Sequence, residues 1–431
     1  MKLVICEKPS VAKAVASALG VTSRVDGCFE GNGLIVSWCV GHLVSPMDAA
    51  GYDPGYKKWK YDDLPILPEP FRYVLAKGKE DAFQNLKRLM DREDVTELVN
   101  ACDAGREGEL IFRLVYEMAG CRKPFSRLWI SSMEDAAIRE GFQNLRPGAE
   151  YDPLYQSALC RQKADWLIGI NATRLFSVLY HRTLNVGRVQ TPTLAMLVDR
   201  DWKISSFKKE KYHHVRLALD GAEAVSEKIA APEEAEALRA ACTGAAVTCT
   251  TVTREQKKEN PPKLYDLTSL QREANRLFGY TAKQTLDYAQ ALYEKKLLTY
   301  PRTDSRYLTA DMAESASAVL HLAARVPSFD GCKEFFPDVT LLVNDKKVSD
   351  HHAIIPTLEL EKASLSELPV GERNILLLVC RELLCAVAEP YVYEAVTATF
   401  TCGGQTFTAK GRRILSEGWR EIDHIFRASL K

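Results

Sequence analysis

Two segments of the sequence, 2–20 and 97–118, each run from a short apolar stretch through a polar turn into a helical stretch. Apolar runs of about five residues have the length of a buried strand. Pro9 near the start and Gly20 just after the end mark the stretch between them as a helix. Open α/β sheets built from such units place their chemistry at the carboxyl ends of the strands. The sequence therefore predicts one α/β domain over residues 1–150, with further strands at 33–42 and 127–131.

Both polar turns carry acids beside a cation. Glu7 and Lys8 follow the first strand, and Asp103, Glu107 and Glu109 follow the second. If the strands are neighbours, these carboxylates meet at one edge of the sheet, where a few hard oxygens suit Mg²⁺. The helix dipole alone also explains an acidic turn at a helix start. Because both turns pair acids with a cation, we favour a site that handles phosphate.

A second candidate lies at Tyr300-Pro301-Arg302. A residue before proline avoids the helical region, so Tyr300 is expected to be extended. Arg302 offers a planar fork that fits phosphate. A tyrosine with a nearby arginine suits nucleophilic attack on a phosphodiester, although core packing alone also explains a tyrosine in an apolar stretch.

Adjacent histidines occur at 351 and 352. Neighbouring side chains point to different faces, so both rarely bind one metal ion. One of them could contact phosphate or polarise a catalytic group. A structural histidine is the alternative.

The stretch 161–190 holds five lysines and arginines against one acid, Asp165. Trp59 and Trp166 could stack on unpaired bases, as aromatic residues do in single-strand binders. A solvated helix face explains Arg161 and Lys163 equally well. The residues expected to contact nucleic acid are Trp59, Trp166, Arg174, Asn185, Val186, Gly187, Arg188, Val189, Gln190 and Arg302.

Composition excludes several classes of function. The 431 residues carry 57 Lys+Arg and 57 Asp+Glu, so binding to nucleic acid would need a local basic groove rather than overall positive charge. No window of about 18 apolar residues occurs, which excludes a membrane span, and the N-terminus does not resemble a secretory signal. No P-loop for ATP is present. The twelve cysteines form no Cys-x-x-Cys pair, so zinc is not expected and a reducing cytosol is.

The rest of the sequence predicts further helices and strands and one linker. Residues 158–172 and 232–241 have helical character, and 390–415 alternate as strands do. The charged stretch 255–262 ends in two prolines, which predicts a linker and a domain boundary.

Taken together, these motifs resemble those of the type IA DNA topoisomerases, most closely the bacterial topoisomerase III branch. The matching segments, in order, are Cys6-Glu7-Lys8-Pro9-Ser10, Asp103-Ala104-Gly105-Arg106-Glu107-Gly108-Glu109, Asn171-Ala172-Thr173-Arg174, Val186-Gly187-Arg188-Val189-Gln190-Thr191-Pro192-Thr193-Leu194, Leu298-Thr299-Tyr300-Pro301-Arg302-Thr303-Asp304 and His351-His352-Ala353-Ile354-Ile355-Pro356-Thr357. The resemblance covers nearly the whole chain.

The resemblance implies a multidomain α+β fold around a toroidal hole. It implies an α/β Toprim domain at 1–150 that carries the catalytic and metal site. The first part of a helical strand-binding domain would be 151–210, a β arch would take 211–265 and 386–431, and the domain with the nucleophilic tyrosine would be 266–385.

The resemblance also implies the reaction. Tyr300 would attack a phosphate of single-stranded or locally unpaired DNA, forming a 5′-phosphotyrosine. Another strand would pass before the 3′-hydroxyl reseals the break, relaxing negative supercoils or decatenating without ATP. The implied catalytic residues are Tyr300, Arg302, Lys8, Glu7 and His352, and the implied Mg²⁺ ligands are Glu7, Asp103 and Glu107. We expect a monomer in the bacterial cytosol, with no zinc.

Two departures from the family pattern affect the expected activity. Gly105 stands where the family usually has a second aspartate, and the family normally continues well past residues 418–420. The alternative function is therefore a truncated, catalytically incomplete module of the same fold that binds single-stranded DNA. Other Toprim enzymes, such as primases or nucleases, would not need Tyr300-Pro301-Arg302.

Overall fold

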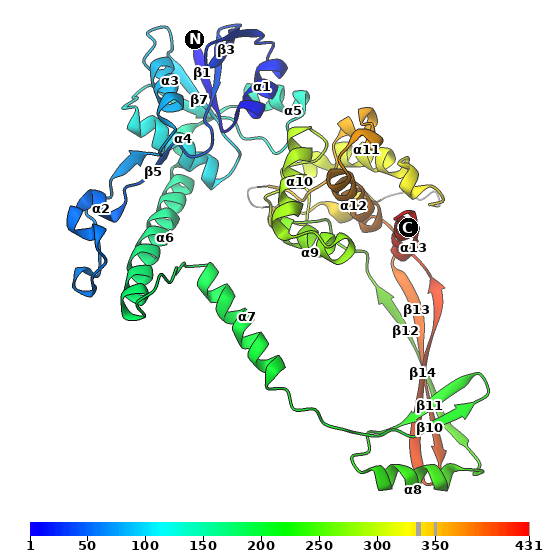
Figure 1. Cartoon of the computed structure of the whole chain (residues 1–431). Coiled ribbons are helices and arrows are strands. Elements are labelled where there is room, and N and C mark those ends of the chain that lie inside the picture. The colour runs from blue at the N-terminus through cyan, green and yellow to red at the C-terminus, as the bar shows by residue number, and fades with distance from the viewer. Residues whose placement is uncertain (333–337, 349–350, 431) are drawn as a thin grey trace. The chain divides into compact units, whose positions relative to one another are not determined.

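The computed structural model describes residues 1–332, 338–348 and 351–430. The chain divides into two compact units, many of whose elements are labelled in Figure 1. The first unit comprises Met1–Asp201, Asp266–Arg306 and Lys346–Leu376, and the second comprises Trp202–Tyr265, Tyr307–Asp345 and Leu377–Lys431.

A seven-stranded sheet forms the centre of the first unit, in the order β2-β3-β4-β1-β7-β8-β9. Its middle strands are parallel: β4 (Leu34–Trp38), β1 (Lys2–Cys6), β7 (Glu97–Ala101) and β8 (Phe125–Arg127). The strands β2 (Ser23–Val25), β3 (Cys28–Gly31) and β9 (Arg146–Pro147) pair antiparallel at the edges. The predicted strands at 2–6 and within 33–42 are confirmed, whereas the strand predicted at 127–131 ends at Arg127.

Both faces of this sheet are covered by helices. Leu3 and Ile5 of β1 belong to the core beneath α3 (Glu80–Met90) and α4 (Arg106–Met118). Val4 and Cys6 belong to the opposite core, beneath α1 (Pro9–Ala18) and α5 (Asp135–Gln143). A strand buried on both faces is largely apolar, which is why β1 and β7 can be recognised in the sequence as short apolar runs.

The other elements of the first unit lie outside this sheet. They are β5 (Val44–Pro46), β6 (Tyr73–Leu75), α2 (Ala49–Tyr52), α6 (Asp152–Leu179), α7 (Gln190–Ser205), α9 (Leu267–Phe278) and α10 (Ala282–Glu294). The helix predicted at 158–172 is confirmed as part of α6. Capping boxes at Asp266 and Thr281 begin α9 and α10. The end of α10 leads into the segment that carries Tyr300.

The second unit contains a five-stranded antiparallel sheet in the order β10-β11-β14-β13-β12. Its strands are β10 (Arg216–Leu219), β11 (Ala222–Ser226), β12 (Thr248–Glu259), β13 (Tyr391–Cys402) and β14 (Gln405–Ser416). Its helices are α8 (Pro232–Cys242), α11 (Ala313–Ala324) and α13 (Trp419–Ser429), while α12 (Val370–Ala386) begins in the first unit and ends in the second. The predicted helix at 232–241 and the predicted strands within 390–415 are confirmed.

The linker predicted at 255–262 is wrong for its first half. Residues 255–259 belong to β12, which pairs with β13 as far as Glu259 opposite Tyr391. β12 is an edge strand whose side chains are almost all exposed. Charged residues suit such an edge, because they discourage pairing with another chain.

No helix within the described residues combines the length and apolar character needed to cross a membrane.

Candidate active site

The two acidic turns meet at one edge of the central sheet. β1 and β7 are neighbouring parallel strands in register to their last residues, so Glu7 and Asp103 leave the sheet side by side. Burial raises the pKa of Glu7 to about 7, and the Asp103 carboxylate adds to this rise. Burial also raises the pKa of Asp103, although the Lys8 and Arg302 cations oppose that change. Two half-buried acids whose pKa values are both raised form a place where a nearby positive charge is favoured.

A buried arginine shapes the Asp103 turn. Arg127, at the end of β8, is fully buried. Its guanidinium donates hydrogen bonds to the carbonyl oxygens of Asn100 at 2.9 Å, Cys102 at 2.7 Å and Asp103 at 2.7 Å. The sequence alone does not indicate this role, because an arginine at the end of a strand gives no sign that its donors turn inward.

Glu109 belongs to the same buried network. Its carboxylate lies 3.2 Å from Nε of Arg127 and accepts hydrogen bonds from Arg113 at 2.8 Å and Asn100 at 2.9 Å. Glu109 is fully buried. Residues two apart on a helix point to opposite sides, so Glu109 enters the core while Glu107 stays near the surface.

Tyr300 lies beside the two acids. Its backbone N–H donates to the carbonyl oxygen of Ser131 at 3.1 Å, and its ring packs against Tyr293 with centroids 5.4 Å apart. Burial raises the pKa of the phenol well above its ordinary value. The charge of Asp103 and a hydrogen bond with it add to the rise, while Arg302 opposes it. The hydroxyl therefore faces an acceptor for its proton.

The structure brings His351, rather than His352, to Tyr300. The His351 ring lies 4.4 Å from the Tyr300 ring between centroids. Its Nδ1 is 3.1 Å from Oγ of Ser131, and its Nε2 contacts the carbonyl oxygen of Ala104. Burial lowers the pKa of His351 to about 4, so its imidazole is neutral at neutral pH. His352 is buried, with Nδ1 2.7 Å from the carbonyl oxygen of Ala353.

Two cations accompany the acids. Lys8 Nζ lies 3.5 Å from Oε1 of Glu294, the last residue of α10. Arg302 is exposed yet acts electrostatically on Glu7, Asp103 and the phenol. Both positive charges are thus available to a phosphate placed over Tyr300.

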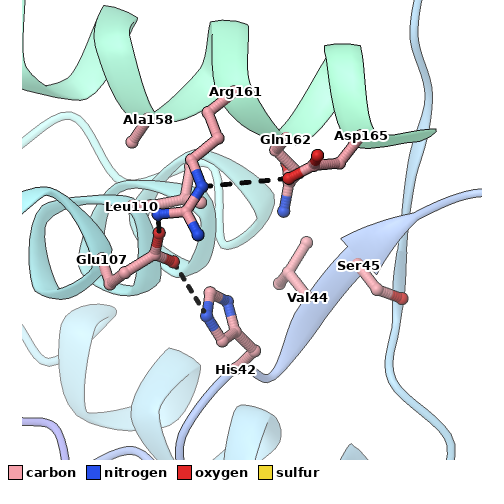
Figure 2. Close-up of a pocket in the computed structure, with 9 residues that line it drawn as sticks. All are labelled: His42, Val44, Ser45, Glu107, Leu110, Ala158, Arg161, Gln162 and Asp165. Carbon is pink, nitrogen blue, oxygen red and sulfur yellow. Dashed lines mark hydrogen bonds and ion pairs between the residues drawn. The ribbon is translucent and has the colours of Figure 1, made fainter. Parts of the chain in front are cut away.

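Glu107 lies apart from the Glu7–Asp103 pair, in a pocket of about 250 Å³ between α4 and α6 (Figure 2). One oxygen is 3.0 Å from Nη1 of Arg161, and the other is 3.6 Å from Nε2 of His42. The hydrogen bond with His42 and the charge of Arg161 lower the pKa of Glu107. Among the described residues, no three His, Cys, Asp or Glu side chains are grouped to hold a metal ion.

Glu7 and Asp103 nevertheless fit Mg²⁺, which binds few carboxylates and keeps several waters. Gly105, next along the turn, has φ 165° and ψ 170°, an extended conformation that any residue adopts. A Cβ built there meets no atom within 4 Å. An aspartate at 105 would therefore be free of both steric conflict and backbone strain.

The expected nucleic-acid residues have different environments. Trp59 is 42% exposed and lies 5.4 Å below the guanidinium of Arg174. Arg174 is buried and donates to the carbonyl oxygen of Tyr56 at 2.8 Å. Asn171 holds the same loop by accepting from the N–H of Ile66 at 2.6 Å and donating to its carbonyl oxygen at 3.0 Å. These side chains of α6 keep Trp59 in place at the surface.

Trp166, in contrast, is half-buried and fastened to the segment before α6. Its indole N–H donates to the carbonyl oxygen of Met47 at 3.1 Å, and its ring meets Tyr52 and Phe71 edge-on. These contacts leave it poorly placed to stack on a base.

The loop from 185 to 190 is largely exposed and fastened to α6. Thr173 accepts from the N–H of Val186 at 2.9 Å, and Arg188 donates to Asp165 at 2.7 Å. The exposed residues are Asn185, Arg188, Val189 and Gln190, with Val186 and Gly187 half-buried.

Two family models match the sequence. Residues 149–429 match the model described as DNA topoisomerase, and residues 2–133 match the Toprim domain. The chain is 42% identical to DNA topoisomerase 3 of Shouchella clausii (strain KSM-K16) and 41% identical to DNA topoisomerase 3 of Bacillus subtilis (strain 168). Each match covers 97% of this chain and 59% of the relative, so the chain spans about three fifths of the length of these curated relatives.

The fold is also similar to that of a solved structure, full-length topoisomerase I from Thermotoga maritima. The TM-score is 0.73 at 24% sequence identity, over 97% of this chain and 67% of that one.

Proposed function

The chain belongs to the type IA DNA topoisomerase family, and on this premise we propose that it breaks and rejoins one strand of DNA through Tyr300. The observation that carries the proposal is the position of Tyr300, buried between Asp103 and His351 at the sheet edge that also bears Glu7. The curated relatives do not favour the alternative of a module that only binds single-stranded DNA.

The proposed cleavage step joins the Tyr300 oxygen to a DNA phosphorus and releases the 3′-oxygen of the neighbouring nucleotide. Asp103 accepts the phenolic proton, because it already accepts a hydrogen bond from that hydroxyl. Lys8 and Arg302 stabilise the charge on the phosphate, and Lys8 is placed to protonate the leaving oxygen. Neutral His351 holds the phenol ring in position, and the catalytic role expected of His352 stays a proposal.

We further propose Mg²⁺ as the cofactor, held by Glu7 and Asp103. When bound, the ion supplies positive charge that keeps the phosphotyrosine and the free 3′-end together for resealing. Because Glu107 is engaged by His42 and Arg161, we propose that it contributes to the site only indirectly.

The remaining expectations are proposals of the same kind. We propose a monomer that acts on single-stranded or locally unpaired DNA in the bacterial cytosol, without ATP or zinc.

The deciding experiment is a covalent-adduct assay with labelled single-stranded oligonucleotide, followed by denaturation. The parent protein should form an adduct, and Tyr300→Phe should form none while binding the oligonucleotide nearly as well, since one hydroxyl contributes little to a long interface. Tyr293→Phe is a matched control, because Tyr293 packs on Tyr300 from the same side of the sheet. An adduct that persists in Tyr300→Phe would exclude Tyr300 as the nucleophile.

A further inference from the structure

We infer that Glu134, Asp135, Lys296 and Leu358 form a polar clasp that positions the Tyr300 segment against the Toprim sheet and releases it when a strand passes. The inference rests on the proposed function, because release has a role only if strands pass. These residues lie in parts of the chain far apart in sequence, all within the first unit.

The first contact of the clasp joins Asp135, at the start of α5, to Lys296, shortly after α10. The Lys296 ammonium donates a hydrogen bond to Oδ1 of Asp135. The side chains are 25% exposed for Lys296 and 43% exposed for Asp135. This hydrogen bond lowers the pKa of Asp135, and a carboxylate at a helix N-terminus is favoured in its own right.

The second contact lies one residue earlier on the Toprim side. The backbone N–H of Leu358 donates to Oε1 of Glu134 at 3.1 Å, and Ser132 donates to the other oxygen at 3.1 Å. These two hydrogen bonds hold the Glu134 carboxylate against the segment that contains Leu358.

The two partners on the tyrosine side are tied to each other. Thr357 donates from its hydroxyl to the carbonyl oxygen of Lys296, and from its backbone to that of Leu297 at 3.2 Å. The N–H of Thr299 donates to the carbonyl oxygen of Ile355 at 3.0 Å. Lys296, Tyr300 and Leu358 therefore belong to one hydrogen-bonded piece, which the clasp can hold or release as a whole.

The backbone of Lys296 supports a role for its side chain. Lys296 has φ 66°, in the left-handed region that favours glycine. A lysine there is strained, and strain of this kind persists where the surroundings impose it. Its N–H bond to the carbonyl oxygen of Tyr293 at 2.9 Å and the Thr357 contact hold the turn. In that turn the ammonium reaches Asp135.

The clasp is weak enough to open. Partly exposed ion pairs shift an equilibrium by only about 1.5- to 5-fold. The clasp therefore biases the closed state without locking it, while Tyr293 and Tyr300 supply the apolar part of the same contact.

Charge reversal and exchange test the clasp. Lys296→Asp, and separately Asp135→Lys, should raise the equilibrium fraction of covalent adduct about threefold, because the freed strand end separates from the phosphotyrosine. The initial cleavage rate should stay within about twofold of the parent, since Tyr300 and its neighbours are unchanged. The exchanged pair, Asp135→Lys with Lys296→Asp, should restore the parental fraction, as should Lys296→Arg.

A matched control is available next to Lys296. Lys295 pairs with Glu372, and both residues lie in the first unit with Tyr300, outside the residues that match the Toprim domain. Lys295→Asp removes an ion pair of the same kind without touching the clasp, so its adduct fraction should equal the parent's.

Cross-linking tests release directly. Asp135→Cys with Lys296→Cys, joined by a short reducible thiol cross-linker, should still cleave and reseal an oligonucleotide but should not relax supercoiled DNA until reductant is added. The parent treated in the same way controls for the exposed native thiols Cys160 and Cys249.

The outcomes distinguish a failure of the clasp from a failure of the proposed function. A parent that forms no adduct removes the proposed function and this inference with it. A parent that forms adduct, with reversed and exchanged variants indistinguishable from it, overturns the clasp alone. Equal loss of thermal stability and of cleavage in the single, exchanged and Lys296→Arg variants would show a structural contact and would also overturn it.

Discussion

At the scale of single residues, the site opposes the ionisation of Tyr300, the proposed nucleophile. Tyr300 is buried beside Asp103, and both features raise the pKa of the phenol. Arg302 opposes this, and any phosphate bound nearby would be attacked only as the proton leaves. Proton acceptors and cations are therefore as necessary to the reaction as the hydroxyl.

The Glu7 carboxyl gives a pH prediction for metal-free protein. Its pKa is about 7 in the folded state and about 4.3 in an unfolded chain. A raised carboxyl pKa stabilises the fold fully below the unfolded value, and this stability is lost as pH rises to the folded value. With a chelator present, unfolding by urea should show a free energy that falls by roughly 3 kcal/mol at most between about pH 4 and pH 7. Glu7→Gln should flatten that fall, and an unchanged slope in this variant would remove Glu7 as its source.

Gly105 gives a second prediction. The extended backbone and the empty space around it mean that Gly105→Asp adds a carboxylate without strain. The Mg²⁺ concentration at the midpoint of religation should fall severalfold, as read from loss of adduct during a metal titration. Gly108→Ala is the contrasting variant, because a Cβ there would lie 2.1 Å from the carbonyl oxygen of Asp103 and should distort the turn. A midpoint that does not fall in a folded Gly105→Asp protein would contradict the idea of a missing ligand.

At the scale of elements, three neighbouring strand ends build the site. β1, β7 and β8 stop at the same edge of the sheet, and Arg127 ties their last turns together through backbone carbonyls. Glu109, from the first turns of α4, neutralises that arginine. The position of Asp103 therefore depends on an ion pair inside the core.

Arg127→Met tests this dependence. Removing Arg127 takes away one of the two arginines that face the buried Glu109 and leaves three carbonyl oxygens without their donor, and breaking such a buried network typically costs up to about 3–5 kcal/mol. We expect a loss of this size in the free energy of unfolding, measured in urea, and a loss of adduct formation below the unfolding transition. Arg239→Met is the control, because Arg239 pairs with Glu236 on an exposed helix face and should change stability little. Equal stability of the two variants would mean that the network does not support the site.

At the scale of the whole molecule, a chain with equal numbers of acids and bases would need local charge and stacking for the DNA binding proposed above. The two candidate tryptophans differ in how well they are placed to stack on a base. Trp59 is exposed under Arg174, whereas Trp166 is fastened to Met47, Tyr52 and Phe71.

Binding measurements should reflect this division. Affinity for single-stranded oligonucleotide should fall with salt, with a slope of about −0.7 per phosphate neutralised, and fully paired duplex should bind less well. Trp59→Ala should weaken single-strand binding, since stacking contributes about 1–3 kcal/mol per base. Trp166→Ala should instead lower the melting temperature. Equal binding of Trp59→Ala and parent would exclude Trp59 as a stacking residue.

The sequence by itself determined the features that are local in the chain. β1 and β7 can be recognised in the sequence because strands buried on both faces are largely apolar. Glu7 and Asp103 follow those strands directly, so parallel neighbours had to bring them together, and Tyr300 and Arg302 stand within one short motif. The family followed from these motifs in their order.

Tertiary structure decided whatever depends on the direction of a side chain. His351 and His352 differ only in register, and the pairing of Thr299 with Ile355 sets which ring meets Tyr300. Glu107 and Glu109 belong to one acidic turn, yet α4 points one toward Arg161 and the other into the core. The charged residues 255–259 became an edge strand because β13 was there to pair with them. Each of these outcomes rests on a partner distant in sequence, which no local pattern of residue types contains.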